Sequence, residues 1–143
     1  MNILHDAPEF KPSEAMIAEE VIDSYLHDPK CSGYHVLVAE DESVIIGYIC
    51  YGPTPLTEGT WDLYWEVVAQ ERRGQGTGGT LMKAAERAIR RDKGRLAIIE
   101  TSSTPAYEKT RHFHLAHGYE IIARIPDFYS PGDDKLILQK RLG

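Results

Sequence analysis

The 143-residue chain has little cysteine and no long hydrophobic run, and each absence excludes a class of protein. Its two cysteines, Cys31 and Cys50, form no CxxC pair, so no disulfide framework is indicated. No apolar run approaches the ~20 residues that a membrane-spanning helix needs, and the first residues lack the basic and apolar pattern of a signal peptide. We therefore expect a soluble, cytoplasmic protein in a reducing compartment.

The chain also has fewer basic residues than acidic ones. The sequence has 16 Lys and Arg against 22 Asp and Glu, which gives a net charge of -6 at pH 7. A molecule of that sign repels nucleic acid and anionic membrane surfaces, so neither is an expected partner. The chain has the length of one ordinary domain and shows no repeat, low-complexity tract or linker. We expect a single domain over residues 1–143.

The hydrophobic pattern predicts a mixture of helices and strands. Apolar residues at helical spacing indicate helices over 13–28, 79–94 and 106–118. β-branched and aromatic runs indicate strands over 34–41, 43–52, 60–69, 95–100, 119–125 and 135–142, with a loop over 126–134. In the strand over 60–69, strict alternation predicts one face with Trp61, Leu63, Trp65 and Val67 and another with Asp62, Tyr64, Glu66 and Val68.

Residues 72–80 read RRGQGTGGT, with four glycines in nine positions. The stretch is not a Walker loop, because no lysine stands between Gly79 and Thr80. Gly74, Gly76 and Gly79 do match G-x-G-x-x-G, and Glu100 follows about 20 residues later, as a dinucleotide site requires. Polar residues separate these glycines from the preceding strand, however, and an antiparallel hairpin comes before that strand. A nicotinamide-dependent oxidoreductase stays as an alternative.

The segment from Arg73 to Gly78 also reads Arg-x-x-Gly-x-Gly and opens a helix after an apolar strand. Unpaired amides at a helix start favour a phosphate, and glycine removes the Cβ atoms that would keep it away, so a pyrophosphate is the expected ligand. With this motif, and with the stretches SGYHVLVAED, YGPTPLTEGTWDLYW and ARIPDFYSPGDDKLILQKRL, the chain resembles the GNAT superfamily of acyl-CoA-dependent N-acyltransferases. The resemblance covers nearly the whole chain.

The resemblance implies an α/β (α+β) fold, in which helices flank a mixed, mostly antiparallel sheet and the family's first strand is missing. It implies acetyl-CoA as cosubstrate and transfer of the acetyl group to a primary amine of a small molecule, amino acid or peptide N-terminus. The amine would attack directly within a ternary complex, and a homodimer is compatible with this interpretation. A non-catalytic acyl-CoA-binding module or sensor is the main alternative, because an expected catalytic tyrosine is replaced.

Carried over residue by residue, the resemblance also implies the contacts with acetyl-CoA. The strand before the glycines would run along the pantetheine arm, with an amide near Val68 polarising the thioester carbonyl. Tyr107 stands where the family commonly has an asparagine that anchors the arm. The implied cofactor-binding residues are Glu66, Val67, Val68, Arg73, Gly74, Gln75, Gly76, Thr77, Gly78, Gly79 and Tyr107.

Acetyl transfer to an amine needs two proton transfers. The resemblance makes Glu100 the expected general base, with Glu66 and Asp62 in reserve. His114 replaces the tyrosine that usually protonates the departing thiolate, and with an ordinary pKa of about 6.5 a minority of that histidine carries the proton at pH 7. Tyr129, in the predicted loop, is expected either to hold the amine or to take over the missing tyrosine's role.

The three histidines of the last predicted helix do not indicate a metal site. His112 and His114 point to nearly opposite sides of a helix, and only His114 and His117 share a face. We expect no bound metal, and we expect His112 and His117 to be solvated or packing residues.

Overall fold

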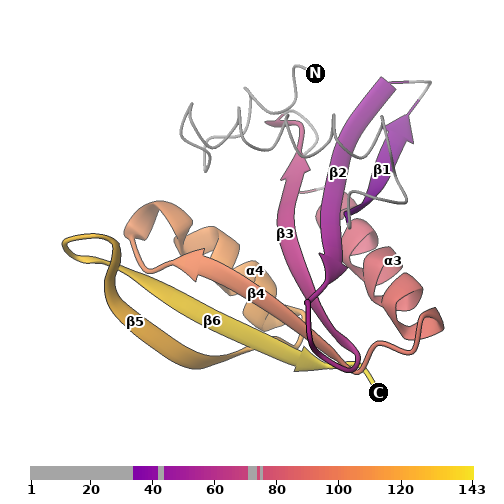
Figure 1. Cartoon of the computed structure of the whole chain (residues 1–143). Coiled ribbons are helices and arrows are strands. Elements are labelled where there is room, and N and C mark those ends of the chain that lie inside the picture. The colour runs from indigo at the N-terminus through magenta and orange to yellow at the C-terminus, as the bar shows by residue number, and fades with distance from the viewer. Residues whose placement is uncertain (1–33, 42–43, 71–73, 75) are drawn as a thin grey trace.

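The computed structural model describes residues 34–41, 44–70, 74 and 76–143. They form a six-stranded sheet with two α-helices and one short 3-10 helix (Figure 1). Both the helix predicted over 13–28 and the position of the missing first strand fall outside the described residues. In chain order the elements are β1 (His35–Asp41), β2 (Val44–Pro53), β3 (Thr60–Val68), α3 (Thr77–Arg91), β4 (Leu96–Ser102), η2 (Pro105–Tyr107), α4 (Glu108–Ala116), β5 (Glu120–Ser130) and β6 (Asp133–Arg141).

The sheet is mixed and mostly antiparallel, which confirms the predicted fold class. Its strand order is β1-β2-β3-β4-β6-β5, and β3 with β4 is the parallel pair. A dinucleotide-binding fold needs a largely parallel sheet, so this topology removes the oxidoreductase alternative. Neither described helix has the length and apolar character that crossing a membrane requires.

The parallel pair separates along its length. The register of β3 and β4 runs from Thr60 opposite Leu96 to Leu63 opposite Ile99, although both strands continue for several residues. Figure 1 shows the two strands diverging from this point, with α4 alongside β4. The ladder therefore stops in the middle of the sheet.

A β-bulge in β3 changes which residues face the helices. Ile49 and Tyr51 are two residues apart on β2, but their partners Glu66 and Leu63 are three apart, so β3 holds one extra residue at Tyr64. Directly opposed residues share a face of the sheet. Glu66 therefore lies on the same face as Leu63, and the strict alternation predicted for residues 60–69 is wrong beyond the bulge.

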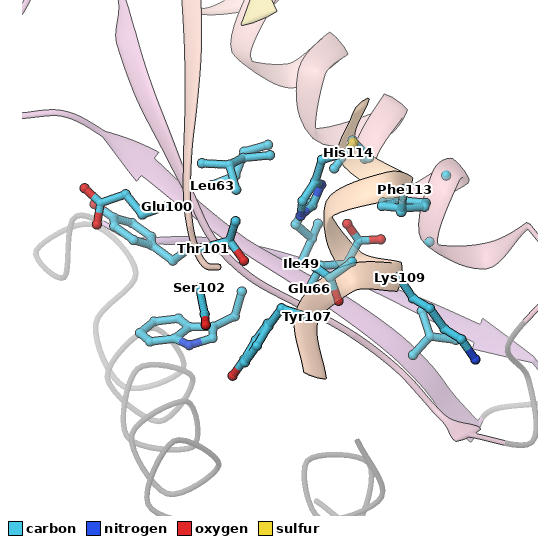
Figure 2. A pocket seen from close by; sticks show the side chains of 18 of the residues that line it. Ile49, Leu63, Glu66, Glu100, Thr101, Ser102, Tyr107, Lys109, Phe113 and His114 are labelled. Carbon is cyan, nitrogen blue, oxygen red and sulfur yellow. The ribbon is translucent and has the colours of Figure 1, made fainter. Parts of the chain in front are cut away.

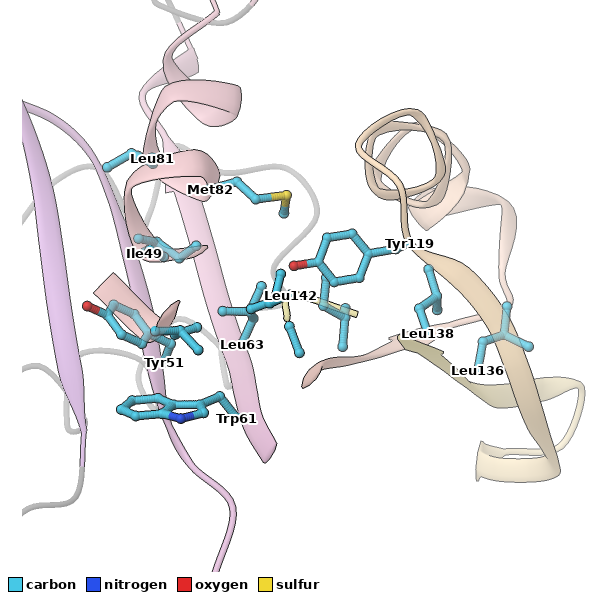
Figure 3. Packing of buried hydrophobic residues seen from close by; sticks show 14 residues of the cluster. Ile49, Tyr51, Trp61, Leu63, Leu81, Met82, Tyr119, Leu136, Leu138 and Leu142 are labelled. Carbon is cyan, nitrogen blue, oxygen red and sulfur yellow. The ribbon is translucent and has the colours of Figure 1, made fainter. Parts of the chain in front are cut away.

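The hydrophobic core lies between α3 and the sheet. Met82 and Ile89 of α3 are almost completely buried and pack against residues of the inner strands, among them Ile49 and Leu63 (Figure 3). Burying one such side chain contributes about 1.5–3 kcal/mol, so this cluster fixes α3 on the face that also carries Glu66. The start of α3 is thereby held beside the diverging end of β3.

The C-terminal hairpin differs from the prediction. β5 continues through most of the segment expected to be a loop over 126–134 and turns at Pro131 and Gly132 into β6. Every residue of β5 is exposed. Asp127 accepts a hydrogen bond from the Gly132 amide and donates its own amide to Asp134, so its carboxylate shapes the turn.

Candidate active site

A cavity of about 890 Å³ opens where β3 and β4 diverge. Figure 2 shows side chains of β3, β4 and α4 around it. Because one cavity collects them, the glycine segment and all three expected catalytic residues belong to one site. The expected residues among its lining are Glu66, Val68, Gly74, Gly76, Thr77, Gly78, Gly79, Glu100, Tyr107, His114 and Tyr129.

Three expected cofactor contacts are not among the described lining residues. Arg73 and Gln75 lie outside the described residues. Val67 is 2% exposed and pairs with Tyr48, so its side chain lies on the face of the sheet away from Glu66. A contact between Val67 and a bound arm would therefore involve its backbone.

The glycines form a cradle at the start of α3. Gly74 and Gly76 have φ of 82° and 81°, the left-handed conformation that favours glycine, and a Cβ on either would meet nothing within 4 Å. The first hydrogen bond of the helix runs from the Thr80 amide to the Gly76 carbonyl at 3.0 Å, so the preceding amides have no acceptor within the helix. No acidic residue stands in the first turn, which leaves the positive end of the helix open to an anion.

Two further glycines let the helix start pack closely on the cavity wall. A Cβ at Gly78 would lie 2.9 Å from Glu66 Oε1, and a Cβ at Gly79 would lie 3.0 Å from His117 Nε2. The open space over Gly74 and Gly76 and the tight contact at Gly78 fit a diphosphate whose attached arm enters the cavity along β3. Gly74, Gly76, Thr77, Gly78 and Gly79 would hold the diphosphate of acetyl-CoA, which supplies the activated acetyl group.

Glu66 is a buried carboxyl group without a partner. Neither of its oxygens is solvent-exposed or hydrogen-bonded among the described residues. Burial raises the pKa of Glu66 to about 8, because the charged form would lose its hydration. The side chain is therefore mostly a neutral carboxylic acid at pH 7.

His114 is also buried, and its charge state differs from the one expected. Burial, with a smaller contribution from His117, lowers the pKa of His114 to about 4. The ring is 8% exposed, and its Nδ1 atom has no hydrogen-bond partner among the described residues. At neutral pH it is an uncharged imidazole, so the small protonated fraction assumed from the ordinary pKa is not present.

Glu100 lies at the opening of the cavity in a different environment. Its side chain is 49% exposed and forms an ion pair with Lys135, whose ammonium group is 2.9 Å away. The same ammonium group lies 4.3 Å from the centre of the Phe128 ring. Tyr129 lines the cavity from the exposed strand β5. Glu100 is thus a carboxylate in contact with water, at a position open to an incoming amine.

Hydrogen-bonded residues of β4, α4 and β6 that sequence reasoning missed hold one end of the cavity together. Ser102 donates a hydrogen bond to the buried Asp133 at 2.5 Å, and both line the cavity. Arg111 donates to the carbonyls of Ser102 and Thr104, which ties α4 to the end of β4. Ser102 is 31 positions from Asp133 and 9 positions from Arg111 in the sequence, and no periodic pattern or motif connects these residues.

Thiol and metal chemistry have no described residues to support them here. Burial raises the pKa of the Cys50 thiol to about 12, so it is not a nucleophile at neutral pH. No group of three or more metal-ligating side chains is present in the described part of the chain. His117 donates from Nδ1 to the Phe113 carbonyl at 2.8 Å, a packing role within α4.

The chain was compared with known proteins. A family model described as an acetyltransferase (GNAT) domain matches residues 32–121. A solved structure from Desulfovibrio desulfuricans, assigned to the GNAT family of acetyltransferases, is 38% identical with a TM-score of 0.96, covering 99% of this chain and 89% of that chain. No curated protein matched.

Two other solved structures are more distant. A ribosomal-protein-alanine N-acetyltransferase from Brucella melitensis is 26% identical with a TM-score of 0.68, covering 89% of this chain and 78% of that one. An aminoglycoside 6'-N-acetyltransferase complexed with coenzyme A is 21% identical with a TM-score of 0.73, covering 94% and 83%. At that identity the second likeness shows the fold alone.

Proposed function

The chain belongs to the GNAT family of acetyltransferases, and from that premise we propose that it transfers the acetyl group of acetyl-CoA to a primary amine by direct attack. The acceptor would be a small molecule, an amino acid or a peptide N-terminus. Acetyl transfer with acetyl-CoA as cosubstrate follows from the family; the choice of acceptor is the proposed part.

One observation carries the proposal: the glycine cradle and a water-exposed carboxylate open into the same cavity. A cationic amine that enters from solvent meets Glu100 first. Loss of a proton from the ammonium group to this carboxylate, directly or through water, frees the nitrogen lone pair for attack. Tyr129 stands beside the same opening and would contact the acceptor.

Direct attack is favoured over a covalent enzyme intermediate. Cys50, the cysteine of the described residues, is buried and carries an inert thiol. The chemistry therefore needs the amine, the thioester and proton-transferring side chains in one cavity. Names of two structural neighbours specify N-acetylation, of an aminoglycoside and of a ribosomal-protein alanine, which supports an amino group as acceptor.

The test is a panel of amines with the full-length chain: free amino acids, polyamines, aminoglycosides and short peptides. Release of free thiol from acetyl-CoA should require one of these amines, and mass spectrometry should show the acetyl group on its nitrogen. As a prior control, acetyl-CoA should raise the melting temperature and NAD should not. Thiol release without acetylated amine, or none with any amine despite tight acetyl-CoA binding, would exclude the proposal.

A further inference from the structure

Acetyl transfer to an amine leaves a thiolate that must gain a proton. A good donor carries a proton at neutral pH, has no competing hydrogen-bond partner and is shielded from bulk water. Most ionisable groups lining the cavity fail one of these conditions. Glu100 forms an ion pair, while Asp62 and Asp133 each accept a hydrogen bond from a side-chain hydroxyl. These three are proton acceptors.

His114 fails for a different reason. With a pKa lowered to about 4, roughly 0.1% of the ring carries a second proton at pH 7. Tyr129, the other expected donor, is 47% exposed on an edge strand, where water competes for the thiolate.

Glu66 meets all three conditions. Its two oxygens are buried and have no hydrogen-bond partner in the part of the chain that the structure describes, and the side chain belongs to the cavity wall between the bulge of β3 and the start of α3. With a pKa of about 8, about 90% of the group is protonated at pH 7. Figure 2 shows its side chain and that of His114 on the same cavity.

We propose that Glu66, as a neutral carboxylic acid, gives its proton to the sulfur of the departing coenzyme A thiolate. This assignment deepens the acetyl transfer proposed above and rests on it. The amine nitrogen forms a bond to the carbonyl carbon, and the carbon–sulfur bond breaks with its electron pair going to sulfur. Glu66 transfers its proton to that sulfur and becomes a carboxylate. The nitrogen gives up two protons in all, one before it attacks and one as the tetrahedral intermediate collapses to the amide, and both leave through Glu100 to solvent. Solvent returns one proton to Glu66 after the thiol has left.

The acidity of the buried group suits this step. A thiol has an ordinary pKa of about 8.5, so transfer from an acid of similar strength is close to balanced in both directions. A carboxylic acid at its ordinary pKa of about 4.3 would be ionised at pH 7 and have nothing to give. The bulge at Tyr64 is what turns the side chain inward, because without it Glu66 would face away from α3.

Other titratable side chains surround the Glu66 carboxyl group. Its raised pKa has burial as its cause, without a contribution from a nearby charge. Glu86, the carboxylate inside the adjoining core, is held by Tyr119 and Lys140 at 2.9 Å each. The titratable groups that line the same cavity or pack against its inner wall are Asp62 and Tyr64 on β3, Glu86 on α3, Glu100 on β4, Tyr107 in η2, Lys109, His114 and His117 on α4, Tyr119 before β5, Tyr129 on β5, and Asp133 and Lys140 on β6.

The experiment compares Glu66→Gln with Glu58→Gln, the same chemical change at an exposed loop residue. Glutamine keeps the shape and a hydrogen-bond donor but cannot transfer a proton. With the best amine from the panel, kcat of Glu66→Gln should fall at least about 100-fold. Its acetyl-CoA dissociation constant, measured by calorimetry, should stay within about twofold of wild type, because a neutral acid and an amide bind alike. Glu58→Gln should match wild type in both.

A second measurement does not depend on turnover. Infrared spectra at pH 7 and pH 9 should show a protonated carboxyl band that is lost at the higher pH in wild type and Glu58→Gln, and that is missing from Glu66→Gln. If this band is absent in wild type, the inference is overturned even where acetyl transfer is confirmed. A greater kcat loss in Tyr129→Phe or His114→Phe than in Glu66→Gln would also overturn it. If no amine is acetylated, the proposed function fails, and with it the step that Glu66 is proposed to serve.

Discussion

The inner wall of the cavity (Glu66, His114) and its rim (Glu100, Lys135) use ionisable residues in opposite ways. On the inner wall the carboxyl and imidazole groups are buried, each has at least one polar atom without a hydrogen-bond partner among residues 34–41, 44–70, 74 and 76–143, and both are neutral at pH 7. At the rim a carboxylate is half exposed and paired with an ammonium group. The same residue type, glutamate, thus stands in two environments in one cavity.

The difference comes from where the sheet opens. β3 turns its bulged half towards α3 and α4, so a residue there is covered by helices, whereas Glu100 is a half-exposed residue near the end of β4 and pairs with Lys135 of the neighbouring strand β6. Desolvation sets the first environment and a counter-ion sets the second. Two carboxyl groups with separated environments can serve as acid and base in one reaction.

The largest expected effect is on stability, and it tests the neutral state of Glu66. Its pKa is about 8 in the folded chain against a model value of 4.5. Below pH 4.5 the Glu66 carboxyl group is protonated in both the folded and the unfolded chain. Between pH 4.5 and 8 this group loses its proton in the unfolded chain but keeps it in the folded chain. The free energy of unfolding therefore decreases as the pH rises through this window. Glu66→Gln removes the loss and should raise the unfolding free energy at pH 7 by about 3 kcal/mol.

Urea denaturation at pH 4.5 and pH 7 measures this effect. The variant should equal wild type at the lower pH and exceed it at the higher one. Glu100→Gln is the matched change at the rim, and its effect should stay within about 1 kcal/mol at both values, because an exposed ion pair contributes little. Equal stability of wild type and Glu66→Gln at pH 7 would mean that the inner wall is ionised like the rim.

A smaller effect should separate the cradle from the outer hairpin. Gly76 and Gly132 have φ of 81° and 83°, and a Cβ on either would meet nothing within 4 Å. Alanine at either position should cost about 1 kcal/mol of stability, because the left-handed conformation disfavours a side chain. Only Gly76→Ala places a methyl group where a diphosphate is expected, so acetyl-CoA should bind at least about tenfold more weakly to it alone.

Calorimetry with acetyl-CoA, together with melting temperatures, decides between the two glycine variants. Equal melting temperatures with unequal affinities would locate the diphosphate at the start of α3. Weakened binding in Gly132→Ala, or full affinity in Gly76→Ala, would move it elsewhere.

The order of elements could be predicted from the sequence because each segment from residue 34 onward has a clear period. The environment of Glu66 and His114 on the inner wall could not be predicted in this way. A single extra residue at Tyr64 leaves no trace in an alternating pattern, yet it moves Glu66 to the other face. The burial of His114 depends on Phe113, Tyr119 and the sheet around it, and no local signal reports that packing.

The extent of β5, which carries Tyr129, differs from the sequence prediction for another reason. Pro126, Pro131 and Gly132 favour a turn, and this composition predicts one loop over residues 126–134. In the structure β5 extends to Ser130, although residues 126–129 have no registered partner on β6 and Asp127 has a φ of 57°, and only Pro131 and Gly132 lie in the turn. The pairing of Ser130 with Asp133 closes this irregular stretch, so Tyr129 lies on an edge strand instead of in a closing loop.

The smallest expected effect concerns Lys135, which competes with an incoming amine for Glu100. Lys135→Met should lower stability by about 1 kcal/mol or less, through loss of a partly exposed ion pair and of the cation–π contact with Phe128. It also frees the carboxylate and removes a like charge, so KM for a cationic amine should fall about two- to threefold at low salt. This decrease in KM should vanish at high ionic strength, where screening weakens the attraction of Glu100 for both Lys135 and the amine. Lys83→Met removes the same charge from an exposed position on α3 and should leave KM unchanged. If KM rises in Lys135→Met, the lysine helps to hold the acceptor, and the rim then binds a group of negative charge beside the amine.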